Sequence, residues 1–360
     1  MKLKPNKKIN IAFVGLGRVF EHYLYIIKKY KLKNFFIASI SDIDPKKLNH
    51  YKNILKTDGF LNYKEILNIK KKIDLVIILT PSGLHYEHSL FFLKKKINVI
   101  TEKPIVMIPK EGERLIKIAK KNKIMFGSVF QNRFNPSLKY LKSLLAKKAL
   151  GEITGFSAKV LWCRYQSYYN DAWHGTWQYD GGVINQQAIH HLDAINWLVG
   201  PIEEVISYKF NALNKLEAED SMVLLIKLKN GIVGTFQATT AARPKDIVAE
   251  ISILGKNGYA TVNGQALNNL GDVMLKNKKI KANKQKYSQK VRNGYGFGHG
   301  LFLKKIIKNL QKRINIPPVS SSESLFITRV IHAIYVSSET KKWVRINHNR
   351  IYNKLGSNNA

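Results

Sequence analysis

Residues 9–20 read INIAFVGLGRVF, and this stretch decides the fold class. Its first six residues, Ile9–Val14, form a short apolar run of the kind that makes a buried strand. Gly15 and Gly17 supply a glycine turn, and an apolar pattern with helical spacing begins at Phe20. A strand, a glycine turn and a helix in this order predict the first unit of a doubly wound sheet.

The alternation of strands and helices continues to about residue 130. Further strands are expected at Phe35–Ser41, Ile73–Leu79, Ile97–Thr101 and Ile124–Val129. Helices are expected from Pro45, at Tyr63–Leu67, at His85–Lys95 and at Lys110–Asn122. The run Ile73–Leu79 is almost continuously apolar, as expected for a parallel strand that is buried on both faces. The first domain is therefore α/β, with a parallel sheet.

After about residue 130 the order of expected strands and helices changes to that of an α+β domain. Strands are expected at Gly155–Leu161, Glu204–Asn211, Ser221–Leu228, Ile232–Ala241 and Ala249–Leu254, with a helix at Ala188–Leu198. Asn230-Gly231 separates two alternating runs and predicts a hairpin. These features predict a largely antiparallel open sheet.

Three later segments complete the predicted organisation. Residues 265–297 are polar and rich in Lys and Asn, which predicts a mobile loop. Leu301–Leu310 and Glu323–Ser338 predict two closing helices. The predicted domains are therefore 1–127, the dinucleotide-binding domain, and 128–346, the substrate-binding and oligomerisation domain, followed by a polar tail over 347–360.

The composition excludes several classes of protein. The 360 residues include 60 Lys and Arg against 24 Asp and Glu, which gives a formal charge of +36. Of the basic residues 50 are lysines spread along the whole chain, so a composition bias explains the charge better than a nucleic-acid surface does. The single Cys163 excludes an internal disulfide and favours a reducing compartment, the cytoplasm. No apolar run reaches the length of a membrane span, and Arg18 interrupts the one that resembles a signal peptide.

The glycine turn predicts a dinucleotide site. Gly15 and Gly17 let the backbone approach a pyrophosphate at the helix N-terminus. Asp42 ends the second strand, where a carboxylate accepts hydrogen bonds from a ribose 2′-hydroxyl and repels a 2′-phosphate. NAD is therefore favoured over NADP. Phe20 stands where the fingerprint has a small residue, and its bulk is expected to loosen the packing of helix on strand.

Three further segments carry the candidate chemistry. TPSGLH at 80–85 and EKP at 102–104 each follow an apolar strand, and DGGVINQQAIHHLD occupies 180–193. In open α/β sheets ligands bind beyond the carboxyl ends of the strands. The first two segments are therefore expected in one crevice.

These motifs together resemble those of the Gfo/Idh/MocA oxidoreductases, over nearly the whole chain. GLG, SD at 41–42, TPSGLH, EKP, QNRFNP at 131–136, DGG…QAIHHLD and NGIVGTFQATT at 230–240 occur in the family's order. The resemblance implies a Rossmann domain and a C-terminal domain whose open sheet lines the active site. It also implies that the other face of that sheet supports homodimers or homotetramers.

The resemblance implies a role for each of a set of residues. Lys103 and His190 are implied as the general acid and base, which suits alcohol oxidation because the hydroxyl proton needs an acceptor. The implied cofactor-binding residues are Gly15, Gly17, Arg18, Val19, Asp42, Thr80, Pro81, Ser82, His85, Glu102, Lys103 and Gln131. The implied substrate-binding residues are Lys103, Arg133, Arg164, Tyr165, Trp177, Gln186, Gln187, His190 and His299. No metal site is predicted.

Two positions depart from the family's pattern. Many members carry an aspartate where this chain has Gln186, so a lysine–histidine mechanism is favoured over a relay of three titrating groups. Relatives that act on UDP-linked amino sugars have an arginine where this chain has His174. Arg133, Arg164 and Tyr165 are the substitute candidates for anionic groups of a substrate.

The aromatic segment Trp162–Trp177 favours a sugar, because flat rings stack on sugar faces and polar tips bind hydroxyls. The segment also resembles that of family members that act on UDP-linked amino sugars, and this resemblance implies an NAD-dependent dehydrogenase of a nucleotide-linked amino sugar or uronate. The alternatives are an inositol or free-sugar dehydrogenase, a nucleic-acid-binding protein and an NAD-binding protein without catalysis.

Overall fold

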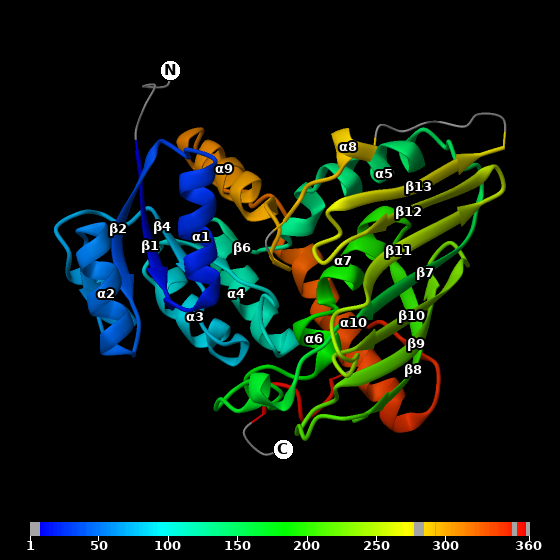
Figure 1. Ribbon diagram of the computed structural model, residues 1–360. Coiled ribbons are helices and arrows are strands. Elements are labelled where there is room, and N and C mark those ends of the chain that lie inside the picture. The colour runs from blue at the N-terminus through cyan, green and yellow to red at the C-terminus, as the bar shows by residue number, and fades with distance from the viewer. Residues whose placement is uncertain (1–7, 277–283, 292, 348–350, 358–360) are drawn as a thin grey trace. The chain divides into compact units, whose positions relative to one another are not determined.

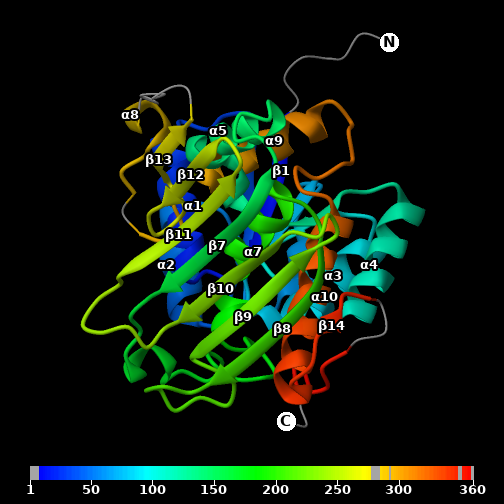
Figure 2. The ribbon, with the colours of Figure 1, turned by 90° about the vertical axis from the view of Figure 1, so that its right-hand side faces the viewer.

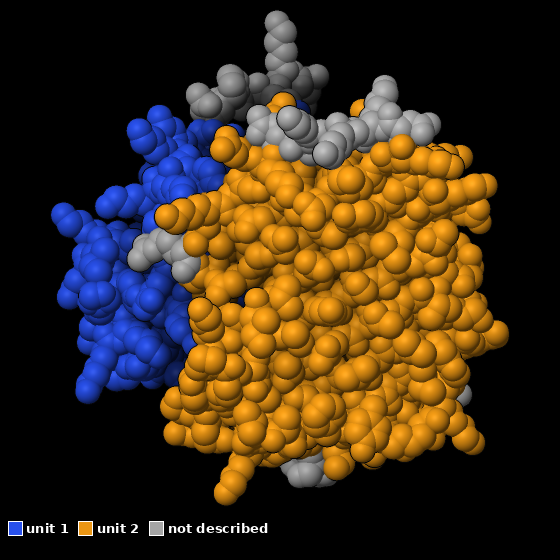
Figure 3. All heavy atoms as spheres, turned by 45° about the vertical axis from the view of Figure 1, so that its right-hand side comes forward, with its two compact units in different colours: residues 1–129, 299–326 blue, residues 130–298, 327–360 orange. Residues whose placement is uncertain are grey.

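The chain divides into two compact units, which Figure 3 colours separately. The computed structural model describes residues 8–276, 284–291, 293–347 and 351–357. Unit 1 comprises residues 1–129 and 299–326, and unit 2 comprises 130–298 and 327–360. The sequence predicted one uninterrupted second domain from residue 128. In the structure, residues 299–326 instead belong to unit 1.

Side-chain contacts explain why residues 299–326 belong to unit 1. His299 hydrogen-bonds Glu102 at 3.2 Å between Nε2 and Oε1. A Cβ on Gly300 would lie 2.6 Å from the ring of Tyr30, so helix and ring are in close contact there. Such contacts link segments far apart in sequence, and no periodicity within 299–326 reveals them.

Unit 1 is built on a six-stranded parallel sheet in the order β3-β2-β1-β4-β5-β6, which confirms the doubly wound prediction (Figure 1). Its strands are β1 (Ile9–Val14), β2 (Phe35–Ser41), β3 (Asp58–Phe60), β4 (Leu75–Ile78), β5 (Asn98–Thr101) and β6 (Phe126–Ser128). Its helices are α1 (Arg18–Lys29), α2 (Pro45–Leu55), α3 (His85–Lys94), α4 (Pro109–Asn122) and, apart from its first residue, α9 (Gly298–Gln311). Short 3₁₀ turns are η1 (Tyr63–Asn68) and η2 (Ser82–Leu84).

The core of unit 1 lies on both faces of this sheet. All four residues of β4 are fully buried, as the continuous apolar run predicted. Phe20 is also fully buried, with its ring edge-on to Phe13 at 5.2 Å and to Tyr51 at 5.0 Å between centroids. The expectation that Phe20 loosens the packing was wrong, because these aromatic neighbours provide a pocket for its ring.

Unit 2 is built on an eight-stranded sheet in the order β13-β12-β11-β7-β10-β9-β8-β14 (Figure 2). Its strands are β7 (Ile153–Leu161), β8 (Ile202–Phe210), β9 (Ser221–Leu228), β10 (Val233–Thr239), β11 (Val248–Gly255), β12 (Gly258–Asn263), β13 (Asn269–Leu275) and β14 (Val344–Arg345). Its helices are α5 (Pro136–Ala146), α6 (Val183–Gln186), α7 (Ile189–Leu198), α8 (Lys284–Tyr287) and the greater part of α10 (Ser321–Thr340), with 3₁₀ turns η3 (Gln131–Phe134) and η4 (Gln166–Tyr169).

Neighbouring strands of this sheet are antiparallel except β7 and β10, which are parallel. The predicted hairpin is confirmed: β9 and β10 pair from Ser221↔Thr239 onward, and Gly231 takes a φ of +84° in the turn. The loop predicted over 265–297 was wrong at Asn269–Leu275, which forms β13. That strand is held by backbone pairing with β12 and has little side-chain signal. Residues 277–283 and 292 of the predicted loop lie outside the described residues.

The two faces of the unit 2 sheet differ. Along β9, Met222, Leu224 and Ile226 are buried, whereas Val223 and Leu225 are exposed. Helices α5, α7 and α10 lie on the buried face (Figure 2). On the other face no helix of the described residues covers the strands.

The predicted polar tail is partly packed. Within its described part, Tyr352 and Leu355 are buried, and the ring of Tyr352 stacks on Tyr335 at 5.1 Å. Residues 348–350 and 358–360 lie outside the described residues. The buried ring of Tyr352 and the buried side chain of Leu355 thus pack this otherwise polar segment against the protein. Among the described helices, none is long and apolar enough to cross a membrane.

Candidate active site

The glycine turn of unit 1 is shaped for close approach. Gly15 has a φ of +93°, and a Cβ there would lie 2.9 Å from the carbonyl carbon of Leu79, so only glycine fits. A Cβ on Gly17 would meet nothing within 4 Å. Gly17 is the N-cap of α1, and as a glycine it supplies no side-chain capping bond to that helix. Open space before uncapped amides fits a pyrophosphate. Arg18 at the first helical position is exposed, and Val19 is half-buried.

Asp42 is fixed beside this turn. Its Oδ2 accepts a hydrogen bond from the Leu16 amide at 2.6 Å, and its Oδ1 accepts one from the Asp44 amide at 2.8 Å. A carboxylate can accept about four hydrogen bonds, so both oxygens retain capacity for ribose hydroxyls. The carboxylate of Asp42 could therefore still accept hydrogen bonds from ribose hydroxyls.

His85 ties together the two turns that follow β4 and β5. Its Nδ1 lies 2.7 Å from the carbonyl oxygen of Pro104, and its Nε2 lies 3.0 Å from that of Thr80. The imidazole is fully buried, and this burial lowers the pKa of His85 against the opposing effect of the two carbonyls. His85 thus supports the EKP turn from inside. Pro81 and the buried Ser82 belong to the other turn, and the peptide bond between Lys103 and Pro104 is cis.

Glu102 is held by residues from two later segments of unit 1. Its Oε1 bonds His299, and its main-chain carbonyl accepts a bond from the Ser128 hydroxyl at 3.1 Å. His299 is 1 % exposed and packs edge-on to the rings of His22 and Tyr23, at 5.1 and 5.3 Å. These contacts assign His299 to the support of Glu102, next to Lys103, rather than to a substrate.

In unit 2 the turn η3 holds helix α7 at two points. Gln131 Nε2 lies 3.4 Å from His190 Nε2. One helical turn further on, Arg133 makes two hydrogen bonds to Asp193, of 2.8 Å from Nε and 2.6 Å from a terminal nitrogen. The guanidinium of Arg133 is thus paired within the protein, which leaves its predicted role at a substrate anion without support.

The two neighbouring histidines of α7 have different surroundings. His191 is 1 % exposed, and burial lowers its pKa to about 3, so that it stays neutral inside the unit. His190 is half-buried beside Gln131 and the edge of Phe130, with 6.0 Å between ring centroids. Only His190 has the access that an acid or base needs.

Two buried glutamine oxygens have unused hydrogen-bonding capacity. Among the described residues, Gln131 Oε1 and Gln187 Oε1 have no hydrogen-bond partner, although both residues are buried. Unpaired buried amide oxygens are costly and are typical of ligand sites, where a hydroxyl completes them. Gln186, one residue earlier, is half-buried at the end of α6.

The aromatic segment contributes one exposed candidate, one half-buried candidate and one buried residue. Arg164 lies 3.0 Å from Asp246 Oδ1, and Tyr165 is 53 % exposed beneath the guanidinium of Arg243. Trp177 is 4 % exposed and packs edge-on to Tyr335 and to Tyr352. Trp177 therefore belongs to the interior, Arg164 is half-buried and paired with Asp246, and Tyr165 is open to a ligand.

His174 is occupied within the same segment. Its Nδ1 lies 2.5 Å from Asp171 Oδ2, and its ring stacks on Trp173 at 3.6 Å. A histidine so paired does not substitute for the arginine of the relatives.

The predicted site residues thus form one group in each unit. Unit 1 holds Gly15, Gly17, Arg18, Val19, Asp42, Thr80, Pro81, Ser82, His85, Glu102, Lys103 and His299. Unit 2 holds Gln131, Arg133, Arg164, Tyr165, Trp177, Gln186, Gln187 and His190. The sequence analysis missed the supporting role of Asp193, which pairs with Arg133. Its signal in the sequence is its place as the last residue of HHLD, about one helical turn after His190.

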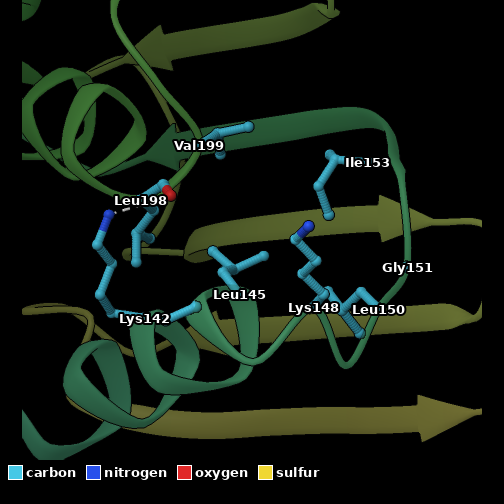
Figure 4. A pocket seen from close by; sticks show the side chains of 9 residues that line it. Lys142, Leu145, Lys148, Leu150, Gly151, Ile153, Leu198 and Val199 are labelled. Carbon is cyan, nitrogen blue, oxygen red and sulfur yellow. Dashed lines mark hydrogen bonds between the residues drawn. The ribbon is translucent and has the colours of Figure 1, made fainter.

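A pocket elsewhere in unit 2 has different chemistry (Figure 4). It is lined by Lys142, Leu145, Ala146, Lys148, Leu150, Gly151, Ile153, Leu198 and Val199. The Lys142 ammonium donates to the carbonyls of Trp197 and Leu198, so it neutralises the C-terminus of α7. No predicted site residue lines this pocket. Within the described part of the chain no three His, Cys, Asp or Glu side chains are grouped to hold a metal.

Comparison with known proteins places the chain in a family. The model of the oxidoreductase family's NAD-binding Rossmann fold matches residues 9–130, and that of its C-terminal alpha/beta domain matches residues 142–346. The chain therefore belongs to the Gfo/Idh/MocA oxidoreductase family, and its first domain is an NAD-binding Rossmann domain. This confirms the resemblance, the fold class and NAD as the cofactor.

The chain is similar to several individual members. It superposes on the WlbA dehydrogenase of Bordetella pertussis, solved with NADH and UDP-GlcNAcA, with a TM-score of 0.87 and 28% identity, covering 96% of this chain and 99% of that one. It is 25% identical to the oxidoreductase YteT of Bacillus subtilis over 57% of this chain and 49% of YteT. It is 24% identical to scyllo-inositol 2-dehydrogenase (NADP(+)) IolW of the same bacterium, over 55% of this chain and 54% of IolW. The chain spans about half the length of these two curated relatives.

Proposed function

We propose that this protein is an NAD-dependent dehydrogenase that oxidises a secondary alcohol of a nucleotide-linked amino sugar or uronate. The observation that carries the proposal is the likeness, over nearly the full length of both chains, to WlbA in complex with NADH and UDP-GlcNAcA. The EKP turn and the α7 histidine are the residues to which the family resemblance gives acid–base roles. An inositol or a free sugar is the alternative substrate, and the similarity to IolW supports it.

Bound NAD would accept a hydride from the carbon that carries the reacting hydroxyl. The chain's own task is to hold that hydroxyl and to remove its proton. His190 suits this task because imidazole titrates near neutral pH, and Gln131 fixes its ring from one side. Lys103 is the second acid–base group, on a turn supported by His85 and Glu102.

Gln186 contributes a hydrogen bond in place of a titrating carboxylate. Its amide can donate to or accept from a sugar hydroxyl, but it cannot carry the proton away. Gln187 and Gln131, with their unpaired amide oxygens, are the further hydroxyl ligands. We assign Arg164 and Tyr165 to the anionic part of the substrate.

Turnover with a panel of substrates tests the proposal. Purified protein with NAD is given UDP-N-acetylglucosamine, its uronate, free aldoses and inositols, and NADH formation is followed by absorbance. We expect turnover with the uronate. Lys103→Ala should lower kcat by about a thousandfold, because general acid–base catalysis contributes on the order of 10²–10⁴. NADH affinity should change little.

The control is Lys95→Ala, which removes an exposed lysine at the end of α3. It should leave kcat unchanged. Turnover retained by Lys103→Ala would remove Lys103 from the mechanism. NADH binding without turnover on any compound would instead favour an NAD-binding protein without catalysis.

We also propose that a second copy of the chain covers the open face of the unit 2 sheet. That face exposes apolar side chains on neighbouring strands: Tyr208, Phe210, Val223, Leu225, Val233, Leu254, Tyr259 and Met274. Apolar surface of this extent is typical of an interface. The molar mass in solution tests for a dimer or tetramer. The free thiol of Cys163 supports a cytoplasmic location.

A further inference from the structure

Glu219 is a buried carboxyl that contacts the turn leading into α6 and α7. It is 1 % exposed and lies just before β9. Its Oε1 accepts hydrogen bonds from the Ile184 amide at 3.1 Å and from the Tyr335 hydroxyl at 3.2 Å. The same hydroxyl accepts a bond from the Gly182 amide at 3.1 Å. One carboxyl and one phenol therefore satisfy two amides of this turn.

The turn is shaped around these two groups. A Cβ on Gly182 would overlap the Glu219 carboxyl, so residue 182 can only be glycine while the carboxyl is in place. Gly181 has a φ of +71°, and a Cβ there would lie 2.9 Å from Leu355 and 3.3 Å from the Tyr335 hydroxyl. A shift of the carboxyl would therefore move the backbone of the turn.

The backbone of the turn continues directly into the candidate site. Val183 begins α6, which ends at Gln186; Gln187 follows α6 directly, and His190 is the second residue of α7. Only six positions along the chain separate Ile184, which Glu219 contacts, from His190, the last residue of this group. The position of the turn therefore sets the position of these side chains.

The surroundings of Glu219 disfavour its ionised form. Among the described residues its Oε2 has no hydrogen-bond partner, and a buried charge that lacks partners is costly. Burial raises the pKa of Glu219 to about 7, against the opposing effect of its hydrogen bonds and of Lys209. The ammonium of Lys209 is itself bonded to Glu339 at 2.8 Å and to the Tyr352 hydroxyl at 3.1 Å.

The other titratable groups nearby do not supply a compensating charge. Burial raises the pKa of Tyr335 well above its usual range, so this phenol stays neutral. Three neighbouring carboxylates bind backbone amides: Glu217 binds that of Trp177, Asp180 that of Gly175, and Asp220 those of Ala212, Leu213 and Asn214.

We propose that Glu219 is a positioning residue that acts in its uncharged form. The protonated carboxyl holds the turn at 181–184 closed, and its ionisation at alkaline pH loosens this turn and displaces Gln186, Gln187 and His190. The inference rests on the proposed function, which assigns these three residues to substrate contact and proton transfer.

The direction of the pH effect follows from the raised pKa. A carboxyl whose pKa is higher in the folded than in the unfolded chain stabilises the fold fully at acidic pH. That contribution is lost as pH rises from the unfolded value of about 4.3 through the folded value of about 7. The turn should therefore be most protected below about pH 4 and least protected above about pH 8.

Hydrogen exchange of the Gly182 and Ile184 amides tests the proposal without using turnover. Rates at pH 6 and pH 8.5 are corrected for the intrinsic pH dependence of exchange. In the wild type, the protection of both amides should fall by about tenfold between the two values. In Glu219→Gln, which keeps the shape but cannot ionise, protection should stay high at both. Glu217→Gln is the matched control and should behave like the wild type.

Equal protection at both pH values in the wild type would overturn the proposal. So would a Glu219→Gln variant that retains the pH dependence. If Glu219→Gln fails to fold, Tyr335→Phe replaces it. Loss of the hydroxyl should raise Gly182 exchange at pH 6 by about tenfold, and unchanged exchange would contradict the arrangement.

The pH dependence of kcat/KM tests whether the turn at 181–184 affects the reaction. The alkaline decline of kcat/KM should begin at higher pH in Glu219→Gln than in the wild type, and NADH affinity should not change with it. An identical decline in both would contradict the positioning role. A pH-dependent turn in a protein that turns over no sugar would refute the proposed function while leaving the carboxyl's effect on the turn intact.

Discussion

Two of the glycine turns that precede helices in the described part of the chain are filled in opposite ways. Gly15 and Gly17 lead into α1, and Gly181 and Gly182 lead into α6. A Cβ on Gly17 would enter open space, whereas a Cβ on Gly182 would overlap the carboxyl of Glu219. The first turn leaves room for an anion from outside. The second already contains a carboxyl from the protein itself.

The difference shows that the first amides of a helix can bind either a ligand or another part of the protein. The first amides of any helix need partners from outside it. Those of α1 have no side-chain cap and are available to a pyrophosphate. At α6 the Ile184 amide is bonded by Glu219, 35 residues further along the chain. Glycines before a helix therefore do not by themselves identify a ligand site.

The largest expected effect comes from filling the open turn with charge. Gly17→Asp places a carboxylate where the pyrophosphate of NAD would bind, and the φ of −78° suits any residue. NADH affinity should fall by about a hundredfold, which equals about 2.7 kcal/mol. Stability should be kept or raised by about 0.5 kcal/mol, because aspartate is a good helix cap. Calorimetric titration with NADH and thermal unfolding measure the two effects.

Gly17→Ser is the control for this substitution, because it also caps the helix but adds no charge. Its NADH affinity should stay within a few-fold of the wild type. If Gly17→Asp binds NADH normally, the open space before α1 is not the pyrophosphate site.

The closed turn should respond to a smaller change. Gly182→Ala adds one methyl group that overlaps the Glu219 carboxyl, and such overpacking costs about 2 kcal/mol. The free energy of unfolding, measured in urea, should fall by this amount. Gly17→Ala is the matched control in the open turn and should change it by less than about 0.5 kcal/mol. Equal costs at the two turns would abolish the distinction between them.

A double variant identifies the cause of that cost. Combining Gly182→Ala with Glu219→Ala removes the overlapping carboxyl. The double variant should therefore be about as stable as Glu219→Ala alone, a coupling of about 2 kcal/mol. Additive losses would show that the methyl group clashes with something other than Glu219.

The fold was predictable to the extent that side-chain periodicity marks each element. The apolar run at Ile73–Leu79 and the Asn230-Gly231 turn predicted β4 and a hairpin that the structure confirms. β13 was missed because backbone pairing with β12 defines it, and its own residues alternate weakly. The return of α9 to unit 1 depends on contacts such as that of His299 with Glu102, which no local pattern encodes.

The candidate site was predictable as a set of motifs but not as a set of contacts. Sequence predicted that Gly15, Asp42 and Lys103 follow strands, and the structure places each of them there. Arg133 and Trp177 carry the residue types of a ligand site, yet salt bridging and ring packing occupy them. No sequence pattern marked Glu219, because its partner Tyr335 lies 116 positions away.

The smallest expected effect concerns Asp42. Its carboxylate accepts a bond from the Leu16 amide in the open turn, and it is also the predicted ligand of the NAD ribose. Asp42→Asn removes the charge but keeps one oxygen to accept the bond from the Leu16 amide. The ratio of NADPH to NADH affinity should rise by about tenfold, because a 2′-phosphate is no longer repelled. The midpoint of thermal unfolding should fall only slightly, since a neutral acceptor weakens the bond by less than about 1 kcal/mol. Fluorescence titrations with both cofactors measure the ratio. An unchanged ratio, together with a lower midpoint, would mean that Asp42 only braces the turn, and the open turn would then select its ligand through the pyrophosphate alone.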